Sequence, residues 1–87
     1  MSYKIKYTKQ AAKDFERIKK SPLKKKALQI LQVLETNPFK QPYEKLSNNL
    51  QGYYSRRLNI QHRIVYEVRE DEKFIAVLSM WSHYENV

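Results

Sequence analysis

Cysteine is missing from this 87-residue chain, and glycine occurs once, at Gly52. Without cysteine there are no disulfide bonds, no cysteine-ligated zinc and no thiol nucleophile. A single glycine cannot form a glycine-rich phosphate loop. The two histidines, His62 and His83, are 21 residues apart among scattered carboxylates, which is not the spacing of a metal site. We therefore expect neither a metal ion nor a cofactor.

Long apolar runs are also missing. No run approaches the roughly 18 residues that span a bilayer, and the start of the chain lacks the apolar stretch of a signal peptide. We therefore expect a cytoplasmic protein that does not associate with a membrane. With 41% hydrophobic and 13% aromatic residues the composition is that of a folded protein. Its length allows one modest core, which predicts a single domain over residues 1–87.

Positive charge is abundant and unevenly placed. The chain has 17 Lys and Arg against 9 Asp and Glu, a net charge of +8. Residues 1–26 hold ten of the basic residues and two acids, whereas residues 27–87 hold seven of each. A one-sided basic surface suits a polyanion, because cations that neutralise phosphates release condensed counterions. The alternative is a solvated, lysine-rich helix face without a partner.

The first 37 residues predict one strand and two helices. Apolar and polar residues alternate over residues 3–7, which is the period of a short strand. Thr8 can cap a helix over residues 9–20, where apolar residues recur at helical spacing. Ser-Pro at 21–22 is typical of a helix start, with the proline in the first position, and we expect this second helix to end at Asn37. The two helices would form a basic hairpin.

The second half of the chain predicts a loop and then strands. Residues 38–51 are interrupted by prolines and asparagines and indicate a loop, which includes Glu44 and a short strand near Leu46. Aromatic and β-branched residues then predict three strands, at residues 53–59, 63–69 and 73–81. Helices followed by a run of strands indicate an α+β fold, with both helices on one face of a largely antiparallel sheet.

The first predicted hairpin has a register that separates polar from apolar residues. Folding about Ile60 places six residues on one face: Tyr54, Arg56, Leu58, Ile64, Tyr66 and Val68. The other face carries Tyr53, Ser55, Arg57, Arg63, Val65 and Glu67. Arg57 then lies opposite Arg63, which is unfavourable unless an anion lies between them. The polar face is therefore a phosphate-site hypothesis, and the alternative is that both arginines reach solvent or Glu67.

Several motifs together resemble the YoeB/Txe family of toxins in the RelE/ParE superfamily. The stretch NPFKQPYEKLSNNLQGYYSRRLNIQHRIVYEV, followed by SHYE, carries Pro-Phe after the second helix, Glu before Leu, Ser-Arg-Arg, His-Arg-hydrophobic-Val-Tyr and a late His-Tyr. The resemblance implies a RelE-like fold and a metal-independent, ribosome-dependent mRNA endonuclease. Two departures are the Lys45, Leu46 and Ser47 that follow Glu44, and the Glu85–Val87 extension.

The resemblance also implies roles for individual residues. Glu44 matches the general base, and Arg63 matches the cation that stabilises the phosphate in the transition state. Without the resemblance, His83 and Tyr84 would be ordinary terminal side chains; with it, they match the general acid and a residue that stacks on a base. Arg57 and Tyr53 are expected to contact the substrate.

The implied partners are mRNA in the small ribosomal subunit and a YefM/Axe-like antitoxin. The family binds operator DNA only through its antitoxin. A homodimer of the toxin is an alternative. Contact with the ribosome is expected from the basic hairpin, at Lys13, Arg17, Lys19, Lys20, Lys24, Lys25 and Lys26. Two alternatives remain: a ParE-like gyrase-inhibiting toxin without nuclease activity, and a non-catalytic basic RNA-binding module.

Overall fold

Two helices and a five-stranded sheet make up the part of the chain that the structure describes. The computed structural model describes residues 3–46 and 52–83, with only the backbone of residues 82 and 83. In chain order the elements are β1 (Lys4–Tyr7), α1 (Lys9–Lys19), α2 (Lys24–Thr36), β2 (Glu44–Lys45), β3 (Tyr53–Arg57), β4 (His62–Arg69) and β5 (Phe74–His83). None of the helices in these ranges is long and apolar enough to cross a membrane.

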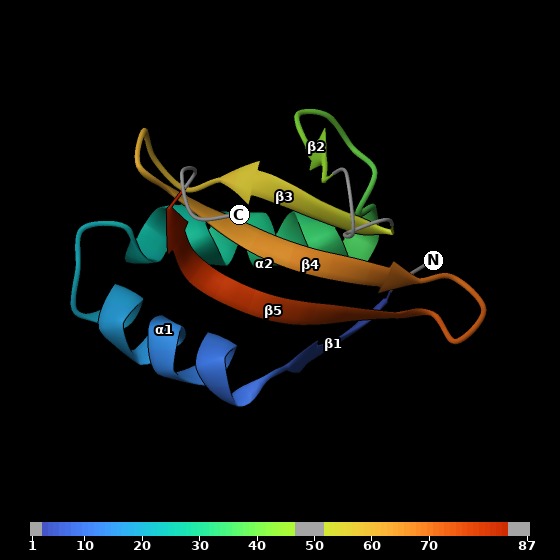
Figure 1. Ribbon diagram of the computed structural model, residues 1–87, viewed down its shortest axis with the longest axis horizontal. Coiled ribbons are helices and arrows are strands. Elements are labelled where there is room, and N and C mark those ends of the chain that lie inside the picture. The colour runs from blue at the N-terminus through green and yellow to red at the C-terminus, as the bar shows by residue number, and fades with distance from the viewer. Residues whose placement is uncertain (1–2, 47–51, 84–87) are drawn as a thin grey trace.

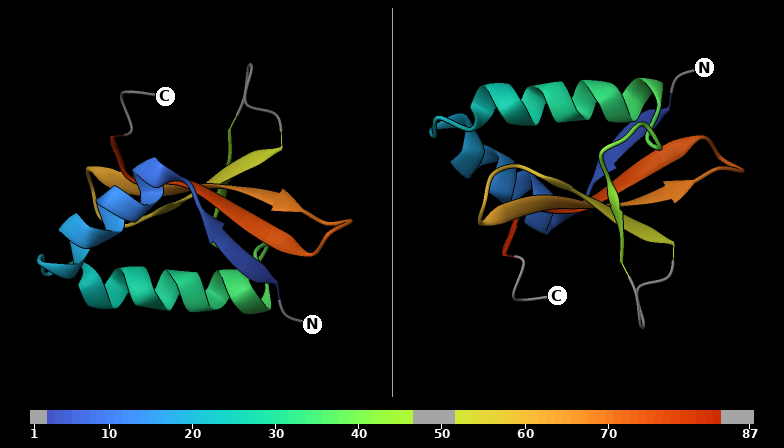
Figure 2. Two further views of the ribbon diagram at one scale, coloured as in Figure 1. Left: turned by 90° about the horizontal axis from the view of Figure 1, so that it is seen from below. Right: turned by 90° about the horizontal axis from the view of Figure 1, so that it is seen from above.

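The sheet has the strand order β1-β5-β4-β3-β2 (Figure 1). β1 pairs with β5 in parallel, and the other three pairings are antiparallel. α2 forms a separate layer on one side of the sheet, and α1 runs obliquely from the β1–β5 edge toward the start of α2 (Figure 2). The predicted α+β fold, a helical hairpin on a largely antiparallel sheet, is confirmed.

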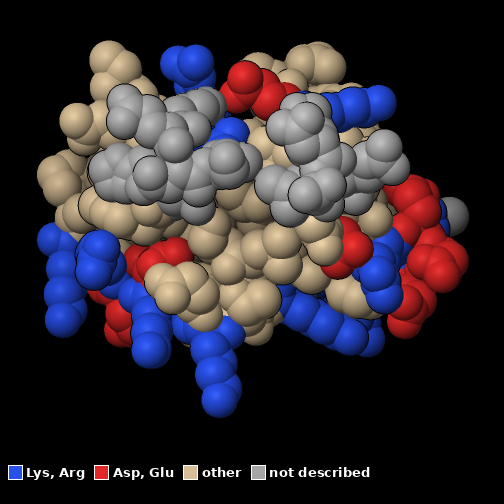
Figure 3. Space-filling view, viewed as in Figure 1, with Lys and Arg blue, Asp and Glu red and all other residues tan. Residues whose placement is uncertain are grey.

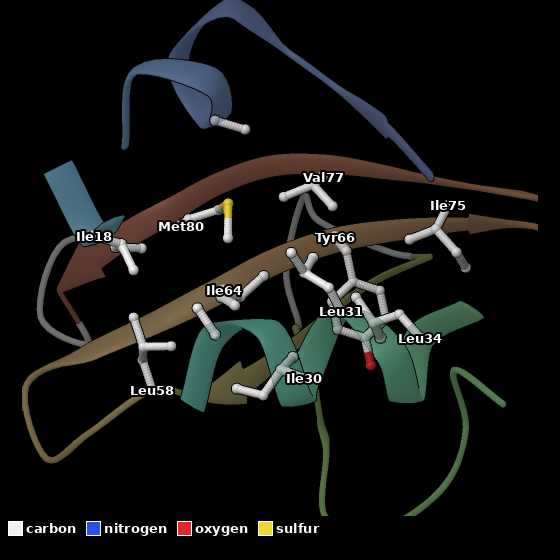
Figure 4. Close-up of a cluster of buried hydrophobic side chains, with 12 residues drawn as sticks. Ile18, Ile30, Leu31, Leu34, Leu58, Ile64, Tyr66, Ile75, Val77 and Met80 are labelled. Atoms are coloured by element: carbon white, nitrogen blue, oxygen red, sulfur yellow. The ribbon is translucent and has the colours of Figure 1, made fainter. Parts of the chain in front are cut away.

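The core fills the space between the helices and the central strands. Buried residues of both helices meet buried residues of β4 and β5, as Figure 4 shows. The fully or nearly fully buried members are Ala11, Ile18, Ala27, Ile30, Leu31, Leu34, Leu58, Ile64, Tyr66, Ile75, Val77 and Met80. Burying a side chain of the Ile, Leu or Val kind contributes about 1.5–3 kcal/mol, so this cluster is the main stabilising feature of the fold.

The ends of the helices agree only in part with the prediction. The Thr8 hydroxyl accepts a hydrogen bond from the Ala11 N–H at 3.1 Å, so it caps α1 as expected. The second helix, however, begins at Lys24 and not at Pro22. Ser21 accepts from the Leu23 N–H at 3.1 Å and also donates to the Ile18 carbonyl, so its hydroxyl stabilises the turn between the helices. α2 itself has no side-chain cap.

The β3–β4 hairpin has the predicted register, with Arg57 opposite Arg63. β3 ends at Arg57, before the predicted residue 59, and β4 begins at His62, before the predicted residue 63, with Asn59 organising the four-residue loop between them. Its side-chain oxygen accepts hydrogen bonds from the N–H groups of Gln61 (2.9 Å) and His62 (2.7 Å). Glu44 and Lys45 form a short strand, just before the position expected near Leu46, so Glu44 is not a loop residue.

An irregular stretch of β5 is held by a buried acid from α1. The β4–β5 register shifts on either side of Val65, which frees part of the β5 backbone from the ladder. The Asp14 carboxylate, 5% exposed, accepts the N–H of Met80 at 3.0 Å and the side-chain amide of Gln10 at 2.8 Å. Asp14 therefore replaces the strand partner that the shift removes, and it ties α1 to the strand that continues to His83.

Candidate functional site

The candidate site lies on the face of the sheet that points away from the helices. Ile64 and Tyr66 of β4 belong to the core under the helices. Because successive side chains of a strand point to opposite faces, Arg63 and Val65 point to the other side. This outer face is therefore the polar face that the sequence pattern predicted for the β3–β4 hairpin.

Three neighbouring strands bring the polar residues together. Glu44 of β2 is directly opposite Ser55 of β3, and Arg57 of β3 is directly opposite Arg63 of β4. Directly paired residues share a face, so Glu44 lies on the outer face with both arginines. It is diagonal to Arg57 on one side and to Tyr53 on the other, with Cα atoms about 7–8 Å apart in each case. A phosphate that contacts Arg57 and Arg63 is thus within reach of the Glu44 carboxylate.

The two arginines of this face differ sharply in exposure. Arg63 is 5% exposed, whereas Arg57 is an exposed residue. The alternative in which both arginines reach solvent is therefore wrong for Arg63. Glu67 accepts a hydrogen bond from Arg69 at 3.1 Å. Like charges on opposed residues are unfavourable, and an anion bound beside the pair would offset the repulsion.

A third arginine, Arg56, lies on the opposite face and fixes the segment that leads into Glu44. Its guanidinium is buried and donates to the carbonyls of Pro42 (2.9 Å), Pro38 and Lys40. The Tyr66 hydroxyl donates to the Pro38 carbonyl at 3.0 Å. The sequence pattern placed Arg56 on the helix-facing side but gave it no role. The role could have been inferred from the pattern itself, because a basic residue among apolar neighbours on a core face needs buried hydrogen-bond acceptors.

Aromatic rings pack around the same segment. Phe39, Tyr43 and Tyr54 contact one another edge to face, with ring centroids 5.5–6.1 Å apart. Tyr54 also lies 5.9 Å from Tyr66. Such pairs contribute about 0.5–1.5 kcal/mol beyond their buried area. Together with Arg56 they hold the chain between α2 and β2 against the edge of the sheet.

The histidine and tyrosine near the end of the chain are described only in part. The His83 backbone pairs with His62, next to the pair formed by Arg63 and Ser82, so it runs beside the arginine. The His83 side chain and all of Tyr84 lie outside the described residues. His62 is buried and stacks on Trp81 with ring centroids 4.2 Å apart, which agrees with a structural role.

The residues expected to contact the ribosome surround the junction of the two helices. All seven are exposed. In Figure 3 the basic side chains gather along the α1 edge, and acidic side chains gather at the β4–β5 turn. The first turn of α2 contains Lys24, Lys25 and Lys26 and no acid. Cations are unfavourable at the positive end of a helix dipole, so this arrangement favours binding of an anion.

Within residues 3–46 and 52–83, no group of three or more His, Asp or Glu side chains is placed to hold a metal ion. The chemistry available on the described outer face is that of one carboxylate and two guanidinium groups. A carboxylate can accept a proton, and guanidinium groups stabilise negative charge on phosphate oxygens.

Comparison with known proteins gives close relatives over part or all of the chain. The family model for YoeB-like toxins of bacterial type II toxin-antitoxin systems matches residues 7–84. Toxin YoeB of Escherichia coli O6:H1 is 41% identical over 54 residues, which is 60% of this chain and 64% of that protein. Toxin YoeB of Synechocystis is 40% identical over 42 residues, 48% of this chain and 46% of that protein. These matches span less than two thirds of the curated relatives.

Solved structures extend the similarity over nearly the whole chain. The YoeB dimer of Staphylococcus aureus is 32% identical with a TM-score of 0.82, covering 97% of this chain and 100% of that one. A YoeB/ParE toxin of Agrobacterium tumefaciens is 26% identical with a TM-score of 0.84, covering 93% and 99%. A heterotetrameric YoeB-YefM complex of S. aureus gives 32% identity and a TM-score of 0.78, covering 97% and 100%. The chain belongs to the YoeB-like toxins of bacterial type II toxin-antitoxin systems.

Proposed function

We propose that this toxin is a ribosome-dependent mRNA endoribonuclease that inhibits translation. The observation that carries the proposal is the strand register that sets Glu44, Arg57 and Arg63 on one face, next to the backbone of His83. A protein that only binds RNA or gyrase needs no carboxylate beside two arginines and a histidine. A nuclease that uses the 2′-hydroxyl of its substrate needs all three types of side chain.

Each step of the cut has a residue to perform it. Glu44 accepts the proton of the 2′-hydroxyl, whose oxygen forms a bond to the adjacent phosphorus. The bond from phosphorus to the 5′-oxygen breaks, and His83 donates a proton to that oxygen. Arg63 and Arg57 stabilise the negative charge that develops on the phosphoryl oxygens. The products are a 2′,3′-cyclic phosphate and a free 5′-hydroxyl.

The partial burial of this cation pair suits the chemistry. Electrostatic interactions are stronger where water is excluded, so the buried Arg63 supplies a fixed positive charge at low reorganisation cost. The exposed Arg57 can contact the substrate as it enters. Tyr84 would stack on a base adjacent to the cut, and Tyr53 would contact the RNA on the other side of Glu44. Stacking of this kind contributes roughly 1–3 kcal/mol per base.

The partners follow from charge and from the relatives. The uncapped, lysine-rich start of α2 and the cations of α1 would bind the phosphate backbone of ribosomal RNA in the small subunit. Docking there would present mRNA to the sheet. YoeB of Staphylococcus aureus is a dimer in one structure and is bound to YefM in another. We infer an antitoxin of the YefM kind for this toxin, with operator DNA bound through it, and a homodimer in its absence.

The test is a translation reaction in which mRNA 5′ ends are mapped. Glu44→Gln and His83→Gln should each slow cutting by about 10²- to 10⁴-fold while leaving the protein folded. Glu35→Gln is the matched control, because it removes an exposed carboxylate on α2 and should cut at the normal rate. Intact mRNA with the unmodified toxin, or normal cutting by both site variants, would refute the nuclease. Equal cutting of naked RNA would refute only the ribosome dependence.

A further inference from the structure

A groove lies between α2 and the edge of the sheet, and it adjoins the proposed active site. Its volume is about 350 Å³. One wall is a stripe of α2, at Lys26, Gln29, Ile30 and Val33. The other wall is the segment 40–44, which leaves the end of α2 and runs past β3 (Figure 2), together with residues 55–57 of β3. Glu44 and Arg57 therefore belong both to the groove and to the outer face where the cut is proposed.

The lining of the groove combines the groups that recognise a nucleotide. Ile30, Val33 and Tyr43 supply apolar and aromatic surface, against which a flat base can pack. Gln29 and Gln41 each offer an amide donor and an amide acceptor, which can pair with the polar edge of a base. The cations Lys26, Lys40 and Arg57 outnumber the one acid, so a phosphate group is accommodated as well.

The groove is a formed feature and not a gap left by a loose loop. The segment that makes its outer wall is fixed by the hydrogen bonds of Arg56 to three carbonyls. Ser55, next to Arg56 on β3, is fully buried, so the strand that forms the inner wall is packed into the sheet.

We propose that this groove is a subsite for one nucleotide of the RNA, the neighbour of the scissile phosphate. The proposal rests on the proposed nuclease function, because the nucleotide enters from the site formed by Glu44 and the arginines. A volume of about 350 Å³ is at the small end of ligand pockets, which suits a single nucleotide. The base would lie along α2 with its edge toward the two glutamine amides, and its phosphate would lie toward Arg57.

The subsite also assigns specificity to residues outside the catalytic set. Gln29 and Gln41 have no role in the proton transfers or in phosphate stabilisation. Amides placed to pair with a base edge discriminate between bases, because a mismatched edge does not present the complementary donor and acceptor. We therefore expect base preference on one side of the cut to depend on Gln29.

The experiment compares two tryptophan substitutions on the same helix. Gln29→Trp fills the groove, whereas Gln32→Trp introduces the same side chain at an exposed position outside it. Both variants and the unmodified toxin are titrated with a 2′-O-methyl RNA trinucleotide, which binds without being cut, and binding is followed by NMR. We expect Gln29→Trp to weaken binding at least tenfold and Gln32→Trp to leave it unchanged. Resonances of residues 29–33 and 40–44 should shift in the unmodified toxin.

Three outcomes would overturn the subsite. Absence of trinucleotide binding by the unmodified toxin at millimolar concentration would refute a formed site, and so would equal binding by Gln29→Trp. Loss of antitoxin binding by Gln29→Trp with normal RNA binding would assign the groove to the protein partner instead. The nuclease proposal is tested separately by mRNA cutting in translation. Normal cutting with no effect of Gln29→Trp on binding refutes the groove alone, and groove-dependent binding without any cutting refutes the nuclease alone.

Discussion

Arg56 and Arg57 are adjacent in sequence but should fail in opposite ways when replaced by methionine. The Arg56 guanidinium is buried and donates to three backbone carbonyls, whereas Arg57 is exposed on the outer face. Methionine keeps most of the length of arginine, so neither substitution leaves a large cavity. Arg56→Met should therefore destabilise the fold, and Arg57→Met should impair catalysis in a protein of normal stability.

The loss of stability in Arg56→Met depends on the three carbonyls that lose their hydrogen-bond donor. Hydrogen bonds from a charged donor contribute about 1.5–3 kcal/mol each. The Pro38 carbonyl keeps its bond from Tyr66, and the carbonyls of the exposed Lys40 and Pro42 can be rehydrated. The full sum of three bonds is therefore not lost. We expect the free energy of unfolding to fall by about 2–4 kcal/mol, against at most about 0.5 kcal/mol for Arg57→Met.

Urea unfolding followed by fluorescence measures this difference directly, because Trp81 is the sole tryptophan and lies in the sheet. Cutting of mRNA is measured in parallel, without urea, at a temperature where both variants are folded. A loss below about 1 kcal/mol for Arg56→Met would show that its hydrogen bonds do not hold the segment before Glu44. A destabilised Arg57→Met with normal cutting would refute the assignment of Arg57 to the phosphate.

Three further predictions test other contacts. Asp14→Ala leaves the buried Met80 N–H without its acceptor and should lower the free energy of unfolding in urea by about 1–3 kcal/mol. Asp14→Asn keeps an acceptor and should lower it less. Equal losses in the two variants would contradict this account. Tyr66→Phe should cost about 1 kcal/mol at neutral pH. Burial raises the pKa of the Tyr66 hydroxyl. The stability that depends on the protonated hydroxyl is therefore complete below the unfolded pKa of about 10, and it is lost as pH rises through the higher folded pKa. The loss of stability at alkaline pH should be smaller in Tyr66→Phe. The double variant Lys24→Glu with Lys25→Glu should stabilise α2 by about 0.3–1 kcal/mol per residue. The same variant should bind the ribosome more weakly and with a smaller salt dependence. Unchanged binding would refute the docking role.

Local patterns predicted most of the fold. The alternation in residues 53–69 was sufficient to set the β3–β4 register, because a shift of one residue would have mixed core and polar side chains. The start of α2 was predicted wrongly, because a serine followed by proline can stabilise an isolated turn as well as a helix. The sequence could not indicate which carbonyls Arg56 would bind, since all three come from an irregular segment of the chain.

The candidate site was predicted by type and only partly by position. The register placed Arg57 opposite Arg63 from the pattern alone. The position of Glu44 on the same face required the β2–β3 pairing, which two residues form and which no periodicity can indicate. The burial of Arg63, and the groove beside α2, depend on contacts between distant segments and have no signature in the sequence.

The parallel pairing of β1 with β5 has a consequence for how the toxin is made. Among the described strands, β1 pairs with β5 alone, so the sheet cannot be completed until nearly all of the chain has been synthesised. Pairings of such long sequence separation also form slowly, because a large loop must close first. We expect β1, α1 and α2 to leave the ribosome before the strands that cover their apolar faces. A nascent toxin would therefore lack the assembled outer face on which the phosphate site is proposed, and the proposed antitoxin would have an interval in which to meet it before that face forms.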